Sequence, residues 1–265
     1  MRKILFIILS VLGICTFSSC NEHKRPIMDE ELSQPTTEEP SQPTTEEPSQ
    51  PTTEELSQPT TEEPLQPTTD GPSQPVTDID GNVYKTVKLG NQVWMAENLR
   101  TTRYADGTPI PLGTESSYDV AYRYYPDDNS ANVSDYGYLY NWAAVMNGSA
   151  SSETNPSGVQ GICPDGWHVP SDAEWDELEN YVSSQNQYVC NDINYIAKAL
   201  ASEEGWNSST YNCDVGNNPS DNNATGFSAR PAGVNDGGFY GYFGSTVYFW
   251  SATRAFGDYD AYYRS

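Results

Sequence analysis

The chain has 265 residues, and 37 acidic against 13 basic side chains give it a formal charge of −24. A chain of that sign is repelled by phosphate backbones, so we expect no binding to nucleic acid. Its one long apolar run lies at the N-terminus and is shorter than the ~20 residues that a membrane-spanning helix needs.

The first 20 residues, MRKILFIILSVLGICTFSSC, have the three parts of a secretory signal. Arg2 and Lys3 precede an apolar run over residues 4–14, and small polar residues then lead to Cys20. The FSSC ending resembles a bacterial lipoprotein cleavage site, which implies removal of residues 1–19 and lipidation of Cys20. We therefore expect an exported protein, lipid-anchored to a bacterial membrane at the outer membrane or cell surface. The alternative is an ordinary signal peptide in which Cys20 has no role.

Residues 20–78 contain a repeat with the unit SQPTTEEP. These units carry almost no apolar side chain, so burial cannot offset the cost of ordering the backbone, about 1–2 kcal/mol per residue. Frequent prolines and repelling Glu pairs favour an extended, polyproline-like chain. We predict a disordered Pro/Thr/Glu stalk that holds the next domain away from the membrane.

The composition changes to Tyr, Trp, Gly and Asn at residue 79, and we predict one folded domain over residues 79–265. Val83, Tyr84, Val87 and Leu89 indicate a strand, and VWM at residues 93–95 indicates the start of a second one. A turn at Gly90–Asn91 separates the two. The sequence thus predicts an antiparallel pair at the start of the domain.

Asp78, Asp80 and Asn82 precede the first strand with the spacing of a calcium loop. The later Asp and the distal Glu of an EF-hand are missing from this run. We interpret the three residues as a turn that leads into the strand.

The stretch CPDGWHVPSDAEWDEL at residues 163–178 combines a cysteine, a histidine and several carboxylates. Ser171 and Glu174 have the spacing of a capping box, and acidic residues in a first helical turn are favoured by the helix dipole. A nucleophilic Cys163–His168 pair would need a thiolate, and a metal site would need further His or Cys ligands. We predict a helix start here, with no catalytic residue and no metal ligand.

A second helix is predicted over residues 192–203, ended by Gly205, with Trp206 packing back onto it. Cys190 and Cys213 flank this helix, and an exported chain can keep disulfides. We expect these two cysteines to form a disulfide, although a pairing of Cys163 with either of them stays open.

Five segments carry a resemblance to a known family. In chain order they are DGNVYKTVKLGNQVWMAENLR, YGYLYNWAAVMN, GICPDGWHVPSDAEWDELENYV, GFSARPAG and YFWSAT. They resemble the Fibrobacter succinogenes major paralogous domain, a family of exported bacterial proteins, over residues 79–265. The resemblance implies an α+β domain of the C-type-lectin-like and formylglycine-generating-enzyme group, with two helices and a twisted antiparallel sheet. It implies no established activity.

The same resemblance bears on the end of the chain and on cofactors. Domains of this family usually close with a strand such as GFSVRCV, whose cysteine would be the partner of Cys163, so we expect the domain to be C-terminally truncated.

A calcium lectin would carry two triplet motifs, and Val234-Asn235-Asp236 matches only part of one. The oxidase branch needs a late pair of reactive cysteines, and none follows Cys213. We therefore expect no cofactor, with calcium as the alternative.

Aromatic side chains gather behind Asn235 and Asp236 in NDGGFYGYFGSTVYFWSATRAFGDYDAYYR, residues 235–264. Aromatic faces beside Asn and Asp suit sugar rings and protein epitopes, although the same rings could fill the core. We predict a non-enzymatic binding or adhesion domain for a glycan or a surface protein. The residues expected at its site are Asn235, Asp236, Tyr240, Tyr242 and Trp250.

The alternative is an extracellular enzyme that acts on a polysaccharide or peptide. Such an enzyme would need two carboxylates about 5–10 Å apart across a cleft. The loop carboxylates available for this role are Asp214, Asp221, Asp236, Asp258 and Asp260. The positions of these residues near Gly and Asn indicate turns instead.

Overall fold

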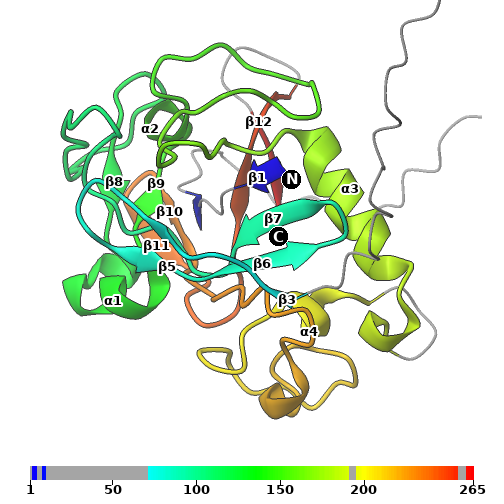
Figure 1. Ribbon diagram of the computed structural model, residues 1–265. Coiled ribbons are helices and arrows are strands. Elements are labelled where there is room, and N and C mark those ends of the chain that lie inside the picture. Colours follow the sequence, from blue (N-terminus) through cyan, green and yellow to red (C-terminus); the bar gives the residue numbers. More distant parts are fainter. Residues whose placement is uncertain (1, 5–7, 10–70, 191–194, 256–260) are drawn as a thin grey trace, which may run out of the picture. The chain divides into compact units, whose positions relative to one another are not determined.

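The computed structural model describes residues 2–4, 8–9, 71–190, 195–255 and 261–265 (Figure 1). The predicted stalk, Cys20, Asp258 and Asp260 lie outside these residues. In the described part of the chain, no helix is both long enough and apolar enough to cross a membrane.

The strands form small sheets in which antiparallel pairing dominates (Figure 1). The four-stranded sheet has the order β1 (Arg2–Ile4), β7 (Gln92–Met95), β6 (Thr86–Leu89) and β3 (Gly71–Pro72). The five-stranded sheet has the order β13 (Ala261–Arg264), β12 (Phe249–Arg254), β2 (Ile8–Leu9), β9 (Leu139–Tyr140) and β8 (Arg123–Tyr124). Two further pairs are β4 (Val76–Thr77) with β5 (Val83–Tyr84), and β10 (Val234–Asp236) with β11 (Phe239–Gly241).

The helices are few and mostly short. The α-helices are α1 (Val133–Tyr136), α2 (Trp142–Met146), α3 (Asp172–Ser183) and α4 (Ala197–Leu200). Single 3₁₀ turns are η1 (Pro126–Asp128), η2 (Ser130–Asn132), η3 (Asn186–Tyr188) and η4 (Pro219–Asp221). The domain is thus mixed α and β, with helices beside small sheets, as the α+β prediction expected.

The predicted antiparallel pair at the start of the domain is confirmed. Its register runs from Thr86 opposite Met95 to Leu89 opposite Gln92. Gly90 has a φ of +57°, and a Cβ atom there would lie 2.9 Å from the ring of Tyr181 on α3. Glycine is therefore required both by the left-handed turn and by the close approach of the helix.

The helix start predicted at Ser171 is also confirmed, because α3 begins one residue later with both hydrogen bonds of a capping box. Trp175, Leu178 and Val182 form its buried face. Trp175 lies with its ring centroid 4.6 Å from that of Trp94 and 5.6 Å from that of Phe249. The helix thereby packs onto strands of both larger sheets.

The second predicted helix is much shorter than expected. Its first residues, 192–194, lie outside the described part, and α4 ends at Leu200 rather than near residue 203. Ala201 is already extended and forms a parallel bridge with Ala229. The tertiary bridge therefore ends the helical pattern that the sequence alone would continue. Trp206 is partly buried and packs against the core.

The disulfide between Cys190 and Cys213 is confirmed, with the two Cα atoms 5.8 Å apart. Cys163 is a free, buried cysteine, and burial raises the pKa of its thiol well above the usual range. Since the thiolate is the reactive form, this side chain is not an activated nucleophile.

Replacing Cys190 and Cys213 together with serine should lower the free energy of unfolding by about 2–4 kcal/mol, because the denatured chain regains the freedom of the closed loop. Urea titration followed by tryptophan fluorescence measures this loss. Reduction of the unaltered protein should give a loss of the same size, and unchanged midpoints in both experiments would contradict the prediction.

Candidate functional site

The strands β10 and β11 form a tight hairpin over the stretch VNDGGFYG. Asn235 pairs with Tyr240 and Asp236 with Phe239, so the loop consists of Gly237 and Gly238. Both glycines have positive φ, +62° and +88°, as a two-residue hairpin turn of this kind requires. The NDGGF motif therefore specifies the turn, and the turn brings Asn235, Asp236 and Tyr240 together.

A hydrogen bond inside the hairpin and the packing of a neighbouring turn hold the hairpin in place. Asn235 is only 4% exposed, and its Oδ1 accepts a hydrogen bond of 3.0 Å from the amide of Gly238. The turn η1 packs against both strands of the hairpin. Burial, the nearby charge of Asp128 and a hydrogen bond with that carboxylate raise the pKa of the Tyr240 hydroxyl.

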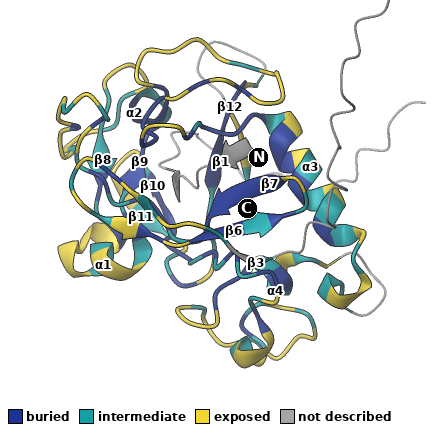
Figure 2. Ribbon diagram, in the orientation of Figure 1, coloured by how far each residue is buried: buried dark blue, intermediate teal, exposed yellow. Residues whose placement is uncertain are grey.

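Two aromatic side chains project from the hairpin into solvent. Phe239 is 66% exposed and Tyr242 is 60% exposed. Tyr242 also has a φ of +60°, a conformation that a bulky residue rarely adopts and that costs about 1–3 kcal/mol. Strained positions of this kind cluster at functional sites. In Figure 2 the strand β10 is mostly buried, whereas β11 is exposed at its first residue and intermediate at the next two.

Trp250, the fifth residue expected at the site, lies instead in β12 and is 7% exposed. Its indole Nε1 donates a hydrogen bond of 2.9 Å to the carbonyl of Tyr140. The hairpin therefore unites four of the five expected residues, and Trp250 contributes to the core.

Asp128 is a member of the site that the sequence reasoning missed. It follows Asp127, and both have positive φ, +53° and +50°. The run PDDN signals a turn, but nothing in the sequence indicates that this turn packs against residues more than 100 positions later.

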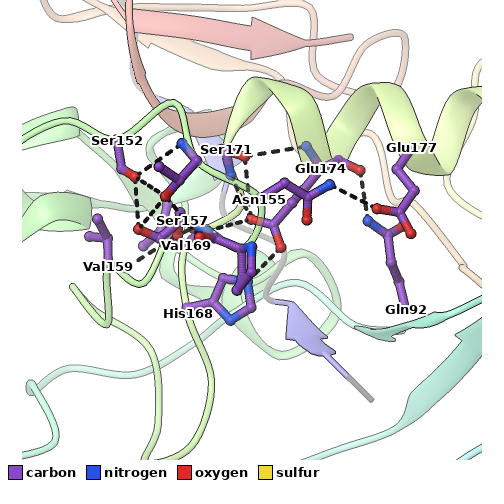
Figure 3. A network of polar contacts seen from close by, with 12 residues as sticks. Gln92, Ser152, Asn155, Ser157, Val159, His168, Val169, Ser171, Glu174 and Glu177 are labelled. Carbon is purple, nitrogen blue, oxygen red and sulfur yellow. Dashed lines mark hydrogen bonds and ion pairs between the residues drawn. The ribbon is translucent and has the colours of Figure 1, made fainter. Parts of the chain in front are cut away.

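His168 belongs to a buried polar network around Glu174, which is 0% exposed (Figure 3). One oxygen of Glu174 lies 2.8 Å from His168 Nε2. The other accepts hydrogen bonds from the amides of Ser157, at 3.0 Å, and Ser171, at 3.1 Å. Gln92 donates to the backbone carbonyl of Glu174 at 2.9 Å.

Both serine hydroxyls of this network bind backbone groups. Ser157 donates to the carbonyl of Val169, and Ser171 accepts from the amide of Glu174 at 3.3 Å. The network therefore joins the loop at Ser157 and strand β7 to the start of α3, and its observed contacts are those of a structural element.

The turn at Asp78 is confirmed as a turn. One Asp78 oxygen accepts hydrogen bonds from the amides of Asp80 and Asn82, both at 2.9 Å. The other accepts from Asn82 Nδ2 at 2.8 Å and from the Tyr84 hydroxyl at 2.6 Å. Donors thus occupy the positions that a cation would take. Across the described ranges, no group of three or more His, Cys, Asp or Glu side chains is arranged to hold a metal ion.

The loop carboxylates of the enzymatic alternative lie in separate elements where they are described. Asp214 accepts a hydrogen bond of 2.6 Å from the Ser209 hydroxyl, Asp221 ends η4, and Asp236 ends β10. Asp214 therefore stabilises its own loop, as expected of a turn residue.

Comparison with known protein families matches residues 87–263 to the Fibrobacter succinogenes major domain. The chain belongs to this family. No curated protein and no solved structure matched the chain. The hairpin, η1 and the Glu174 network all lie inside the matched range of the Fibrobacter succinogenes major domain, whereas the turn at Asp78 precedes it.

Proposed function

We propose that this protein is a non-enzymatic exported lipoprotein that presents a binding domain on a stalk. Cys20 would carry the lipid anchor after removal of residues 1–19, and residues 20–78 would form the spacer. The binding domain would be a variant of the C-type-lectin-like fold, with the hairpin β10–β11 as its ligand surface. The ligand would be a glycan or a surface protein.

The observation that carries this proposal is the pair of exposed rings on a rigid, polar hairpin. The exposed rings of Phe239 and Tyr242 offer apolar faces, and Asp236 on the same hairpin offers a hydrogen-bond acceptor. Sugar rings have apolar C–H faces and polar rims, so they match such a surface, and aromatic contacts of this kind lose little entropy on binding. The Gly237–Gly238 turn and the bond from Gly238 to Asn235 hold the strands in place before any ligand arrives.

The test is a glycan and surface-protein array probed with the chain from residue 20 onward, carrying Cys20→Ser to avoid lipidation. Replacing both Phe239 and Tyr242 with alanine should weaken binding at least about tenfold, because central aromatic residues commonly contribute more than 1.4 kcal/mol to an interface. Binding that persists in EDTA would show that the ligand is held without calcium.

The matched control is Tyr211→Ala, since Tyr211 is 76% exposed but lies outside the hairpin. This variant should bind as the unaltered chain does. An equal loss in the control and in the double variant would place the ligand elsewhere, and a folded chain that binds nothing on the array would refute the proposed surface.

A further inference from the structure

One face of the hairpin β10–β11 carries an exposed aromatic ring beside a carboxylate. Asp236 and Phe239 are directly opposite each other in the register, so their side chains lie on the same face with Cβ atoms about 4.5–5.5 Å apart. Asn235 and Tyr240 form the next pair and lie on the other face, where Tyr240 bonds with Asp128 of η1. The contact with η1 is therefore made by the Tyr240 face, and the Phe239 face is turned away from it.

The ring of Phe239 is positioned by Gly241, two residues further along β11. A Cβ atom on Gly241 would lie 2.6 Å from Cε1 and 3.3 Å from Cζ of that ring. Residues i and i+2 point to the same face of a strand, so a side chain at Gly241 would occupy the space that the ring takes. The ring thus rests on the strand beside Asp236, and its outer side stays exposed.

The charge around this hairpin is negative. The segment 126–136 forms η1, η2 and α1, and it packs against the hairpin through η1. Tyr136 of α1 also contacts Phe243, just after β11, with ring centroids 4.7 Å apart (Figure 1). The segment and residues 234–245 together hold four carboxylates and no basic side chain. These carboxylates are Asp127, Asp128, Asp135 and Asp236.

The negative charge of η1 is not neutralised by a basic side chain of the described residues. Asp127 and Asp128 are exposed, and neither takes part in an ion pair of this part of the chain. Arg123, the basic residue nearest to η1 in the sequence, is engaged elsewhere. Its guanidinium donates to the carbonyl of Ile110 and lies 5.0 Å from the ring centre of Tyr138. A ligand that approaches the hairpin therefore meets a negative potential.

The chemical group that fits an exposed ring beside a carboxylate is a cation. An ammonium or guanidinium group within about 6 Å of an aromatic ring centre is attracted by the ring. The carboxylate of Asp236 would add a charge-assisted hydrogen bond. Lysine and arginine carry such groups on the surfaces of proteins, whereas the charged groups of sugars are most often carboxylates and sulfates, which the four carboxylates repel.

We propose that the Phe239 face of the hairpin binds a lysine or arginine side chain from a basic, surface-exposed segment of another polypeptide, with the cation held between the ring of Phe239 and the carboxylate of Asp236. The inference rests on the proposed function, because it narrows the ligand of the same hairpin to a basic protein segment. Gly241 is a positioning residue, since it gives the ring its place. The carboxylates of η1 and α1 attract the basic segment.

The experiment titrates the full chain, carrying Cys20→Ser, into a fluorescent peptide GSKGSKGSKGS and follows the anisotropy. Saturable binding is expected, with a Kd that rises with salt concentration because salt screens exposed charges. The same peptide with acetylated lysines should bind at least about tenfold more weakly, because hydrogen bonds to charged groups are lost. Equal binding of the acetylated peptide would overturn the proposal.

Three variants test the geometry of the face. Asp236→Asn keeps the shape but removes the charge and should raise the Kd at least about tenfold. Phe239→Leu keeps an apolar side chain without a ring and should raise the Kd about two- to fivefold. Gly241→Ala changes neither charge nor ring, yet it should also raise the Kd, because the added Cβ displaces the ring of Phe239. Unchanged melting temperatures show that the variants are folded.

The matched control is Glu203→Gln, which removes an exposed carboxylate outside the hairpin and should leave the Kd unchanged. An equal loss in Glu203→Gln and Asp236→Asn would mean that the peptide is held only by diffuse attraction to a chain of charge −24, and would overturn the proposal. If Asp236→Asn is unfolded, the comparison uses Phe239→Leu, and an unchanged Kd in that variant overturns the proposal.

The glycan and surface-protein array separates the failure of this inference from the failure of the proposed function. Binding of a neutral glycan that depends on Phe239 and Tyr242, without binding of the lysine peptide, would keep the ligand surface and overturn the basic partner. Tighter binding of a glucosamine oligomer than of the peptide would overturn it in favour of a basic sugar. A folded chain that binds neither the peptide nor any array ligand would overturn both.

Discussion

Replacing Glu174 with alanine is expected to lower the free energy of unfolding by about 3–5 kcal/mol. The carboxylate is fully buried and bonds with the amides of Ser157 and Ser171 and with the ring of His168. Truncation would leave those groups buried without their partner and would also leave a cavity. Urea titration of the purified chain, followed by tryptophan fluorescence, measures the change.

The matched control for this variant is Glu203→Ala, which removes an exposed carboxylate. A surface change of this kind should alter the free energy of unfolding by less than about 0.5 kcal/mol. Glu174→Gln should cause an intermediate loss in the free energy of unfolding. The glutamine side chain keeps the shape and one oxygen acceptor, but its NH2 group faces donors and cannot accept hydrogen bonds from them. A loss below about 1 kcal/mol for Glu174→Ala would show that the network is not a support of the fold.

The second large effect is expected at Asp78, where alanine should reduce the free energy of unfolding by about 2–4 kcal/mol. Four donors converge on this carboxylate, and one is the hydroxyl of Tyr84, whose side chain is fully buried. Burial and the hydrogen bond to Asp78 raise the pKa of the Tyr84 hydroxyl well above its usual range. The phenol therefore stays protonated, and its buried O–H group needs a hydrogen-bond acceptor.

A double-mutant cycle with Tyr84→Phe isolates that contact. Since the two side chains form one hydrogen bond, the double variant should be less destabilised than the sum of the single variants by about 1–2 kcal/mol. Asp119→Ala, at an exposed carboxylate, is the control and should change little. Strict additivity would show that the Tyr84 hydroxyl finds another acceptor when Asp78 is lost.

The features that the sequence predicted correctly are set by local chemistry. Ser171 and Glu174 are three residues apart and cap the same helix, so their spacing alone identifies the start of α3. Gly90 and the NDGG motif likewise specify their turns through backbone conformation. These signals lie within a few residues and need no knowledge of the fold.

The features that the sequence did not reveal depend on distant contacts. α4 stops at Leu200 because Ala201 joins Ala229, and Asp128 reaches the site because η1 packs on a hairpin far along the chain. The sequence places Trp250 at the site because it lies in a run of closely spaced aromatic residues, but the residue is buried in its strand β12. The end of a helix and the burial of a side chain depend here on pairing between segments that are far apart in the chain. The spacing of residues within one segment cannot predict such pairing.

The burial of Cys163 determines which cysteine pairing the folded domain can keep. A thiol exchanges with a disulfide only as an accessible thiolate, and this side chain is fully buried with a raised pKa. Once the domain has folded, Cys163 cannot attack the bond between Cys190 and Cys213. Of the three cysteines in the domain, the pair that folding brings together is thus protected from scrambling in the folded state by the burial of the third.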